Sequence, residues 1–100
     1  MAGPDHSRAS GHAWTLLTSH GRVLLLIAAN PQIKVREIAE QAQITERAAS
    51  GITADLEDAG YLTKQRHGRR TTYAVHPEVA FRHPAESDHR VGELIDVFVH

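Results

Sequence analysis

The order of two short helices and a hairpin within residues 35–75 constrains this chain most. Val35–Ala42 places its apolar residues on one stripe of a helix, and Thr45–Ala59 repeats that spacing. Only two residues separate these helices, so they must cross at a steep angle. Residues 61–75 then form two short strands around a basic centre. A helix-turn-helix followed by a basic hairpin predicts a protein that holds duplex DNA.

The second helix of the pair has clear ends. Thr45 is expected to cap its first turn, and Gly60 stands where a left-handed residue commonly ends a helix. The buried stripe of this helix is predicted to comprise Ala48, Ile52, Leu56 and Ala59. The opposite, exposed face would then carry Arg47, Ser50, Gly51, Thr53 and Ala54.

The hairpin carries its cations at the tip. A two-residue turn at His67-Gly68 would place Arg66 opposite Arg69 and Leu62 opposite Tyr73. Glycine suits such a turn and histidine tolerates a positive φ, although a longer and looser tip is also compatible. Two arginines that face each other repel, so this pairing indicates that an anion binds at the tip.

Apolar segments are expected on both sides of this motif. Residues 13–29 are predicted to form a helix that Thr15 caps and Asn30-Pro31 stops. This helix is apolar on two sides, so either a later segment of the chain or a second subunit must cover one of them. Residues 91–98 repeat apolar side chains at helical spacing, and so short a helix must dock on something.

The remaining segments and the composition fit one small domain. Residues 1–12 are expected to be a disordered arm, residues 13–76 a DNA-binding domain, and residues 77–100 an irregular linker followed by the last helix. The chain has no cysteine, no apolar run of membrane-spanning length and no secretory signal, which favours the cytoplasm. Its net charge of −1 argues against a general DNA-coating protein but not against a specific binder.

Residues 14–76 resemble the winged helix-turn-helix domain of MarR-like transcription regulators. The resemblance rests on residues 35–39, 44–48 and 55–62, the last of which end in Gly60-Tyr61-Leu62 before the basic hairpin. It implies an α+β fold of three helices with a hairpin wing. It also implies a recognition helix in the major groove, a wing on the backbone or in the minor groove, and a homodimer.

Three positions depart from the family's pattern. Gln43 stands where the turn commonly has glycine, so we expect a strain of roughly 1 kcal/mol there. Lys34 replaces the usual Ser or Thr cap. Ala49-Ser50-Gly51 are expected on the solvent side, where many relatives have long polar residues, and here their side chains are short. Such a helix either lies deep in a groove or reads little sequence.

The candidate DNA contacts lie on the motif helices and the wing. Arg47 is the best candidate for reading a guanine, and the wing cations for holding phosphate. In the alternative interpretation, these side chains are solvated surface groups and Arg47 pairs with a nearby acid. The residues expected to contact DNA are Arg36, Thr45, Arg47, Ser50, Thr53, Lys64, Arg66, Arg69 and Arg70.

A homodimer is expected to form through the first and last helices. It would place two recognition helices in successive major grooves, ~34 Å apart. The predicted interface residues are Leu16, Val23, Ile27, Val91, Leu94, Ile95 and Phe98.

Other functions receive less support from the residues. One rival is a winged helix that binds an acidic protein instead of DNA, and another is a sensor whose effector is unknown. Residues 83–89 contain two histidines and two acids, but they lack helical ligand spacing and Pro84 prevents a regular helix, so no metal site is expected. No enzyme signature appears, and no cofactor is expected.

Overall fold

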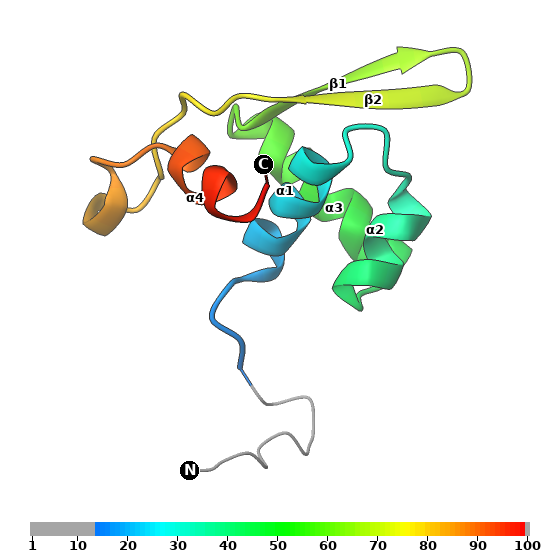
Figure 1. The fold of residues 1–100 in the computed structure, drawn as a ribbon. Helices are drawn as coiled ribbons and strands as arrows, with labels where there is room; N and C mark the ends of the chain where they lie inside the picture. The colour runs from blue at the N-terminus through cyan, green and yellow to red at the C-terminus, as the bar shows by residue number, and fades with distance from the viewer. Residues whose placement is uncertain (1–13, 100) are drawn as a thin grey trace.

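The computed structural model of the protein describes residues 14–99, and these form an α+β winged helix (Figure 1). Three helices lie under a two-stranded antiparallel wing, whose tip lies on the side of α2. A short 3-10 turn and a last helix follow the wing. The elements are α1 (Ser19–Ala29), α2 (Val35–Ala42), α3 (Glu46–Asp58), β1 (Leu62–His67), β2 (Arg70–Val75), the turn η2 (Pro84–Glu86) and α4 (Val91–Phe98). The expected arm, residues 1–12, lies outside the described residues.

The first helix starts later than predicted. Thr18, and not Thr15, is its cap, since the Thr18 hydroxyl accepts a hydrogen bond of 3.1 Å from the Gly21 amide. The Thr15 hydroxyl instead donates to the Leu17 carbonyl at 2.8 Å. Trp14 and Leu16 therefore lie before the helix, on an exposed stretch of chain.

The helix α1 is the centre of the core, and both of its apolar sides are covered by the chain itself. It contacts α2, α3, β2 and α4. Val23 and Ile27 are completely buried, and Val91 of α4 is 2 % exposed. These three side chains were expected at a dimer interface, and that expectation is wrong. A later segment of the same chain, α4, covers the second side of α1.

Left-handed residues end both motif helices. Gln43 has a φ of 61°, which matches the strained turn expected where relatives have glycine. Gly60 has a φ of 87°, and around it the amides of Gly60 and Tyr61 donate back to the carbonyls of Glu57 and Leu56. This is the Schellman pattern, which satisfies the last carbonyls of a helix.

The wing is paired two residues out of the predicted register, which moves its turn along by one residue. His67 lies opposite Arg70 and Leu62 opposite Val75, so the turn consists of Gly68 and Arg69. Gly68 has a φ of 64° while Arg69 keeps a negative φ, as in a type II′ turn. The predicted turn would have required a positive φ at His67, and the observed turn requires it only at glycine. It also removes the predicted repulsion, because Arg66 faces Thr71 and not Arg69.

The segment between the wing and α4 is fastened at both ends, although it was expected to be irregular. An isolated bridge joins Ala80 to Arg90, and the amide of Gly92 donates to the Pro77 carbonyl at 2.9 Å. A Cβ atom at Gly92 would lie 2.8 Å from the Cβ of Pro77, so this close approach requires glycine. The start of α4 is thereby held against the end of β2.

The longest described helix, α3, has 13 residues, and none of the helices between residues 14 and 99 has the length and apolar character needed to cross a bilayer.

Candidate nucleic-acid interface

A basic groove of about 500 Å³ lies between the wing and the helices. Its walls come from both strands of the wing, from Ser50 of α3, and from residues 32–35 before and at the start of α2. One backbone hydrogen bond, from the Tyr73 amide to the Pro31 carbonyl at 2.8 Å, joins the wing to this loop. The cations that line the groove are Lys34, Lys64, Arg66, Arg69 and Arg70, and among the described residues no acid lines it.

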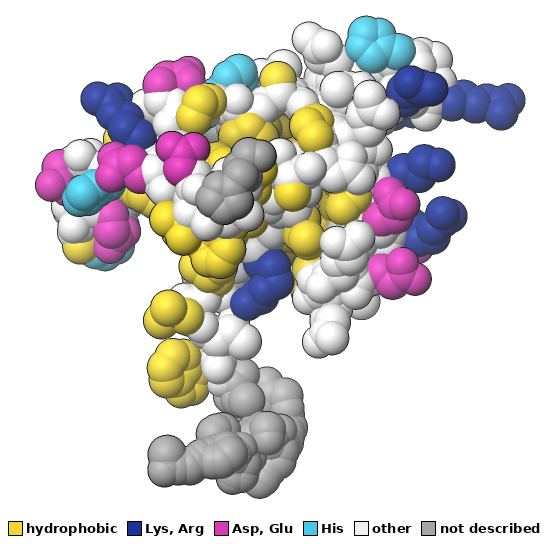
Figure 2. Space-filling view, in the orientation of Figure 1, with side chains coloured by type: hydrophobic (Ala, Val, Ile, Leu, Met, Phe, Trp, Pro, Cys, Tyr) yellow, Lys and Arg dark blue, Asp and Glu magenta, His cyan; other side chains and the backbone are white. Residues whose placement is uncertain are grey.

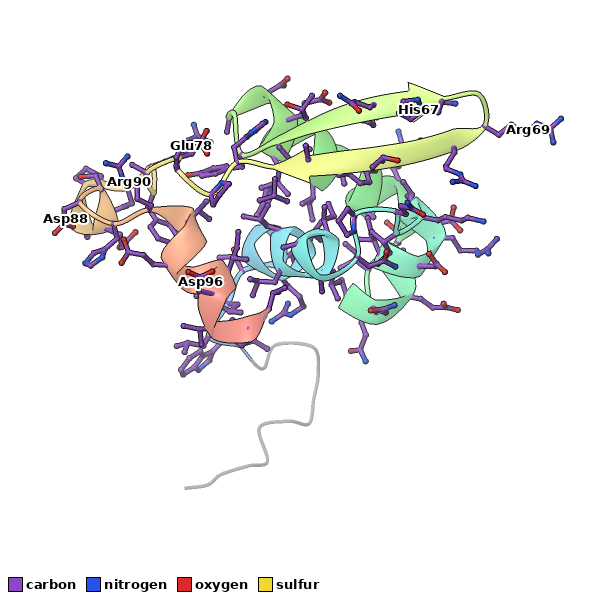
Figure 3. All side chains as sticks on the ribbon, turned by 45° about the horizontal axis from the view of Figure 1, so that its top comes forward. His67, Arg69, Glu78, Asp88, Arg90 and Asp96 are labelled. Carbon is purple, nitrogen blue, oxygen red and sulfur yellow. The ribbon has the colours of Figure 1, made fainter. Side chains whose placement is uncertain are left out.

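The wing cations have no acidic partners in the part of the chain that the structure describes. All ion pairs found there join a histidine to a carboxylate. Lys64, Arg66, Arg69 and Arg70 are all exposed. Lys and Arg side chains gather over the wing tip in Figure 2, and Figure 3 shows Arg69 extending away from the turn. Charge that is neither buried nor paired is free to meet an external anion.

The buried stripe of α3 differs from the predicted one at its beginning. Ala49, Ile52, Thr53 and Leu56 face the core, whereas Ala48 is exposed. Thr53 is 4 % exposed, and its hydroxyl donates to the Ser50 carbonyl at 2.8 Å. The prediction that Thr53 contacts DNA is therefore wrong, as is the exposed position expected for Ala49.

The exposed face of α3 keeps the other predicted residues. Arg47 is exposed and has no carboxylate within 4.0 Å among the described residues, which removes the pairing offered as an alternative. Ser50 reaches the groove. Thr45 is exposed, but its hydroxyl oxygen already accepts a hydrogen bond of 3.0 Å from the Ala48 amide as the cap of α3. Arg36 is exposed on α2, outside the lining of the groove.

Lys34 is a groove residue that the sequence reasoning missed. The sequence indicates only an unusual cap at this position, and the structure completes that cap through the Lys34 amide, which donates to the Glu37 carboxylate at 2.9 Å. This bond leaves the Lys34 side chain available to the groove. The hydrogen bond between the Tyr73 amide of β2 and the Pro31 carbonyl brings the loop that carries Lys34 to the wing. The spacing of residues in the sequence does not reveal this contact.

The base of the wing carries a perturbed phenol. Tyr73 of β2 is 4 % exposed, and burial of its side chain raises its pKa above the usual range, with a further contribution from the negative charge of Glu57 on α3. Tyr73 therefore stays neutral at physiological pH. Tyr73 belongs to the buried core and also lines the groove, so it joins the wing to the helical core.

The histidines and acids before α4 serve local structure. His89 donates from Nδ1 to Glu93 at 2.7 Å, which raises the pKa of His89; the Arg90 amide and His89 lower the pKa of Glu93. Within residues 14–99, no three His, Asp or Glu side chains gather in a way that could hold a metal ion.

Comparison with known proteins decides the family. The sequence profile of the MarR family matches residues 14–70, more than half of the chain. The chain belongs to the MarR family. Members of this family are transcription regulators, which confirms the expectation that the chain is not an enzyme. A search of curated proteins gave no match.

A solved structure agrees with this MarR-type fold. The crystal structure of MepR, a transcription regulator of the Staphylococcus aureus multidrug efflux pump MepA, superposes with a TM-score of 0.54 at 18 % sequence identity. The match covers 80 % of this chain and 56 % of MepR, so the present chain spans little more than half of that MarR-family protein.

Proposed function

We propose that this chain is a transcription regulator that binds double-stranded DNA, with the basic groove and the wing on the phosphate backbone and α3 toward the major groove. The observation that carries this proposal is a groove with five cations and no described acid, on a MarR-type winged helix. The net charge of −1 is compatible with it, because Asp55 and Asp58 line a different groove beside His20. The protein would act in the cytoplasm.

The proposed contacts are a refined version of the predicted set. Arg47 is placed on a base edge and Ser50 on a phosphate or base edge, while Arg36 and the wing cations hold phosphates. Lys34 joins them because it lines the same groove. Binding would act sterically, by obstructing polymerase or another factor.

Salt-dependent binding tests this proposal. Duplex affinity is measured by fluorescence anisotropy at two salt concentrations for wild type, Arg70→Ala and Arg82→Ala. Each substitution removes one positive charge, but Arg82 lines the other groove, beside Asp58. We expect Arg70→Ala to weaken binding and to reduce the salt slope by about one, with Arg82→Ala close to wild type. Equal effects, or no duplex binding at low salt, would favour the rival in which the wing binds an acidic protein.

We also propose a homodimer, formed by a surface smaller than the sequence indicated. Phe98 is 56 % exposed and Leu16 is 89 % exposed, and Leu94 and Ile95 of α4 are partly exposed. Trp14 and Val97, which were not predicted, add 83 % and 67 % exposed apolar side chains. Large apolar side chains exposed to this extent are typical of surfaces that associate.

Sedimentation tests the dimer. Phe98→Glu places a charge on this surface without touching the buried core, so we expect it to dissociate the dimer while the thermal unfolding of the monomer is retained. Lys64→Glu is the matched control on the wing, and it should sediment like wild type. A monomeric wild-type protein at micromolar concentration would end the proposal.

A further inference from the structure

The histidines between residues 14 and 99 fall into two groups. Four of them have a hydrogen-bonding partner within the protein. These pairs are His20 with the Asp55 carboxylate at 2.8 Å, His76 with the Thr63 hydroxyl at 2.7 Å, His83 with the Ala85 amide at 3.0 Å and His89 with the Glu93 carboxylate at 2.7 Å. The ring of the remaining one, His67, is exposed and forms no hydrogen bond or ion pair with any described residue.

His67 lies among the arginines of the wing tip. It is the last residue of β1 and lies opposite Arg70 of β2, so the two side chains share one face of the hairpin. Arg66 directly precedes it, and Figure 3 shows His67 next to the turn from which Arg69 extends. Three arginines, which are charged at any physiological pH, therefore accompany a residue type whose charge changes between about pH 5 and 8.

No described carboxylate balances these charges at the tip. Among the described helices, only α1 and α3 contact the strands. The acid that α3 brings to the wing is Glu57, which accepts a hydrogen bond of 3.4 Å from the Lys64 amide, nearer the base. On α1, His20 and Arg22 bond to α3 and to the segment before α1. Within residues 14–99, no Asp or Glu oxygen lies within 4.0 Å of the ring of His67.

We infer, on the basis of the proposed function, that His67 is a further phosphate contact of the wing and acts as the imidazolium, so that DNA binding takes up a proton from solvent at this residue. A neutral imidazole has one N–H donor and no charge, whereas the imidazolium has two donors and a positive charge. A phosphate beside a histidine favours the protonated form. The affinity for DNA therefore rises as the pH falls through the range in which histidine titrates.

Duplex affinity at two pH values tests this inference. For each protein, anisotropy at constant salt gives the ratio of Kd at about pH 8 to Kd at about pH 5.5, on either side of the histidine range. We expect this ratio to be about three- to fivefold larger for wild type than for His67→Gln, in the upper part of the range of an exposed ion pair. The salt slope of wild type should also steepen by about 0.9 at the lower pH, and that of His67→Gln should change less.

Two further variants separate a local contact from the overall charge. His83→Gln removes one exposed histidine from the segment before α4, and Asp88 of that segment lies at the opposite end of the molecule from His67 (Figure 3). This matched control should keep the wild-type ratio. His67→Arg carries a permanent charge, so it should bind about three- to fivefold more tightly than wild type at about pH 8. Its ratio should be as small as that of His67→Gln.

The alternative outcomes are distinct. If His67→Gln keeps the wild-type ratio, or if His67→Arg remains as dependent on pH as wild type, the inference is overturned. It is also overturned if His83→Gln lowers the ratio as much as His67→Gln, because the response then follows net charge. In these cases DNA binding itself stands. Absence of wild-type binding at low salt at both pH values would instead remove the proposed function.

Discussion

The wing and α3 lie side by side at the proposed interface, but they are built in opposite ways. In β1 five of six residues are exposed, whereas α3 places four residues in the core. The wing concentrates cations and contributes little to packing beyond its base. The helix contributes its packing face and carries short side chains outside. The comparison teaches that folding stability and anion binding are assigned to different elements, so each can be changed with little effect on the other.

The largest expected effect is on stability, and it comes from α3. Leu56 is 5 % exposed within the core, so Leu56→Ala should lower the free energy of unfolding by about 2–5 kcal/mol. Lys64→Ala on the wing should remain within about 0.5 kcal/mol of wild type. Urea denaturation measures both. A loss at Lys64 comparable to that at Leu56 would break the division between the two elements.

A smaller loss is expected at the wing turn. Gly68→Ala forces alanine to adopt a φ near 64°, which should cost about 1–2 kcal/mol. The cost falls on the hairpin, so amide hydrogen exchange should accelerate in β1 and β2 and stay unchanged in α3. Uniform acceleration across the chain would mean that the wing and the helices unfold together.

A gain in stability, and not a loss, is expected from the equivalent glycine-to-alanine change on α3. Gly51 lies inside a helix, and an added Cβ would occupy open space. Gly51→Ala should therefore stabilise the protein by about 1 kcal/mol, because alanine has the higher helix propensity. In a domain of this size, that corresponds to a rise of roughly 4–8 °C in Tm. A decrease in Tm would show that the bare backbone at this position has a structural role.

The smallest effect on stability is expected from Tyr73 at the base of the wing, and only in alkaline solution. The pKa of Tyr73 is raised in the folded protein, mainly by burial and also by Glu57, while the unfolded chain ionises near pH 10. The folded state thus binds its proton more tightly, and stability present below about pH 10 is lost as the pH rises through the raised pKa. Tyr73→Phe should show a shallower decline of Tm between about pH 9 and 11 than wild type. If Tm declined equally with pH in wild type and in Tyr73→Phe, the raised pKa of Tyr73 would be contradicted.

Features that depend on local spacing could be predicted from the sequence. Thr45 and Gly60 mark the ends of α3, and the structure confirms both, since each acts through neighbours within a few residues. The basic tip was also visible, because it is a matter of composition. The exact turn was not, since His67-Gly68 and Gly68-Arg69 both satisfy the preference for glycine, and only the pairing of the whole strand distinguishes them.

Features that depend on tertiary packing were harder to predict. The polar side chain of Thr53 suggests a surface residue, but Thr53 is 4 % exposed, and its hydroxyl is satisfied by the Ser50 carbonyl of its own helix. Val23, Ile27 and Val91 appeared to require a partner subunit, because nothing in the spacing shows that residues 77–91 fold back far enough to bring α4 onto α1. The burial of each depends on contacts between distant segments.

The close approach of Gly92 to Pro77 has a geometric consequence. Six residues of extended strand span about 20 Å, so the wing acts as a lever arm with its fulcrum next to Pro77. A tilt of about 10° at that fulcrum would move Arg69 by roughly 3.5 Å, close to the ~3.4 Å of helix axis that each phosphate of one strand occupies. A methyl group added at Gly92 would displace Pro77, next to this fulcrum. A displacement of a few tenths of an ångström there would become a larger displacement of the wing tip.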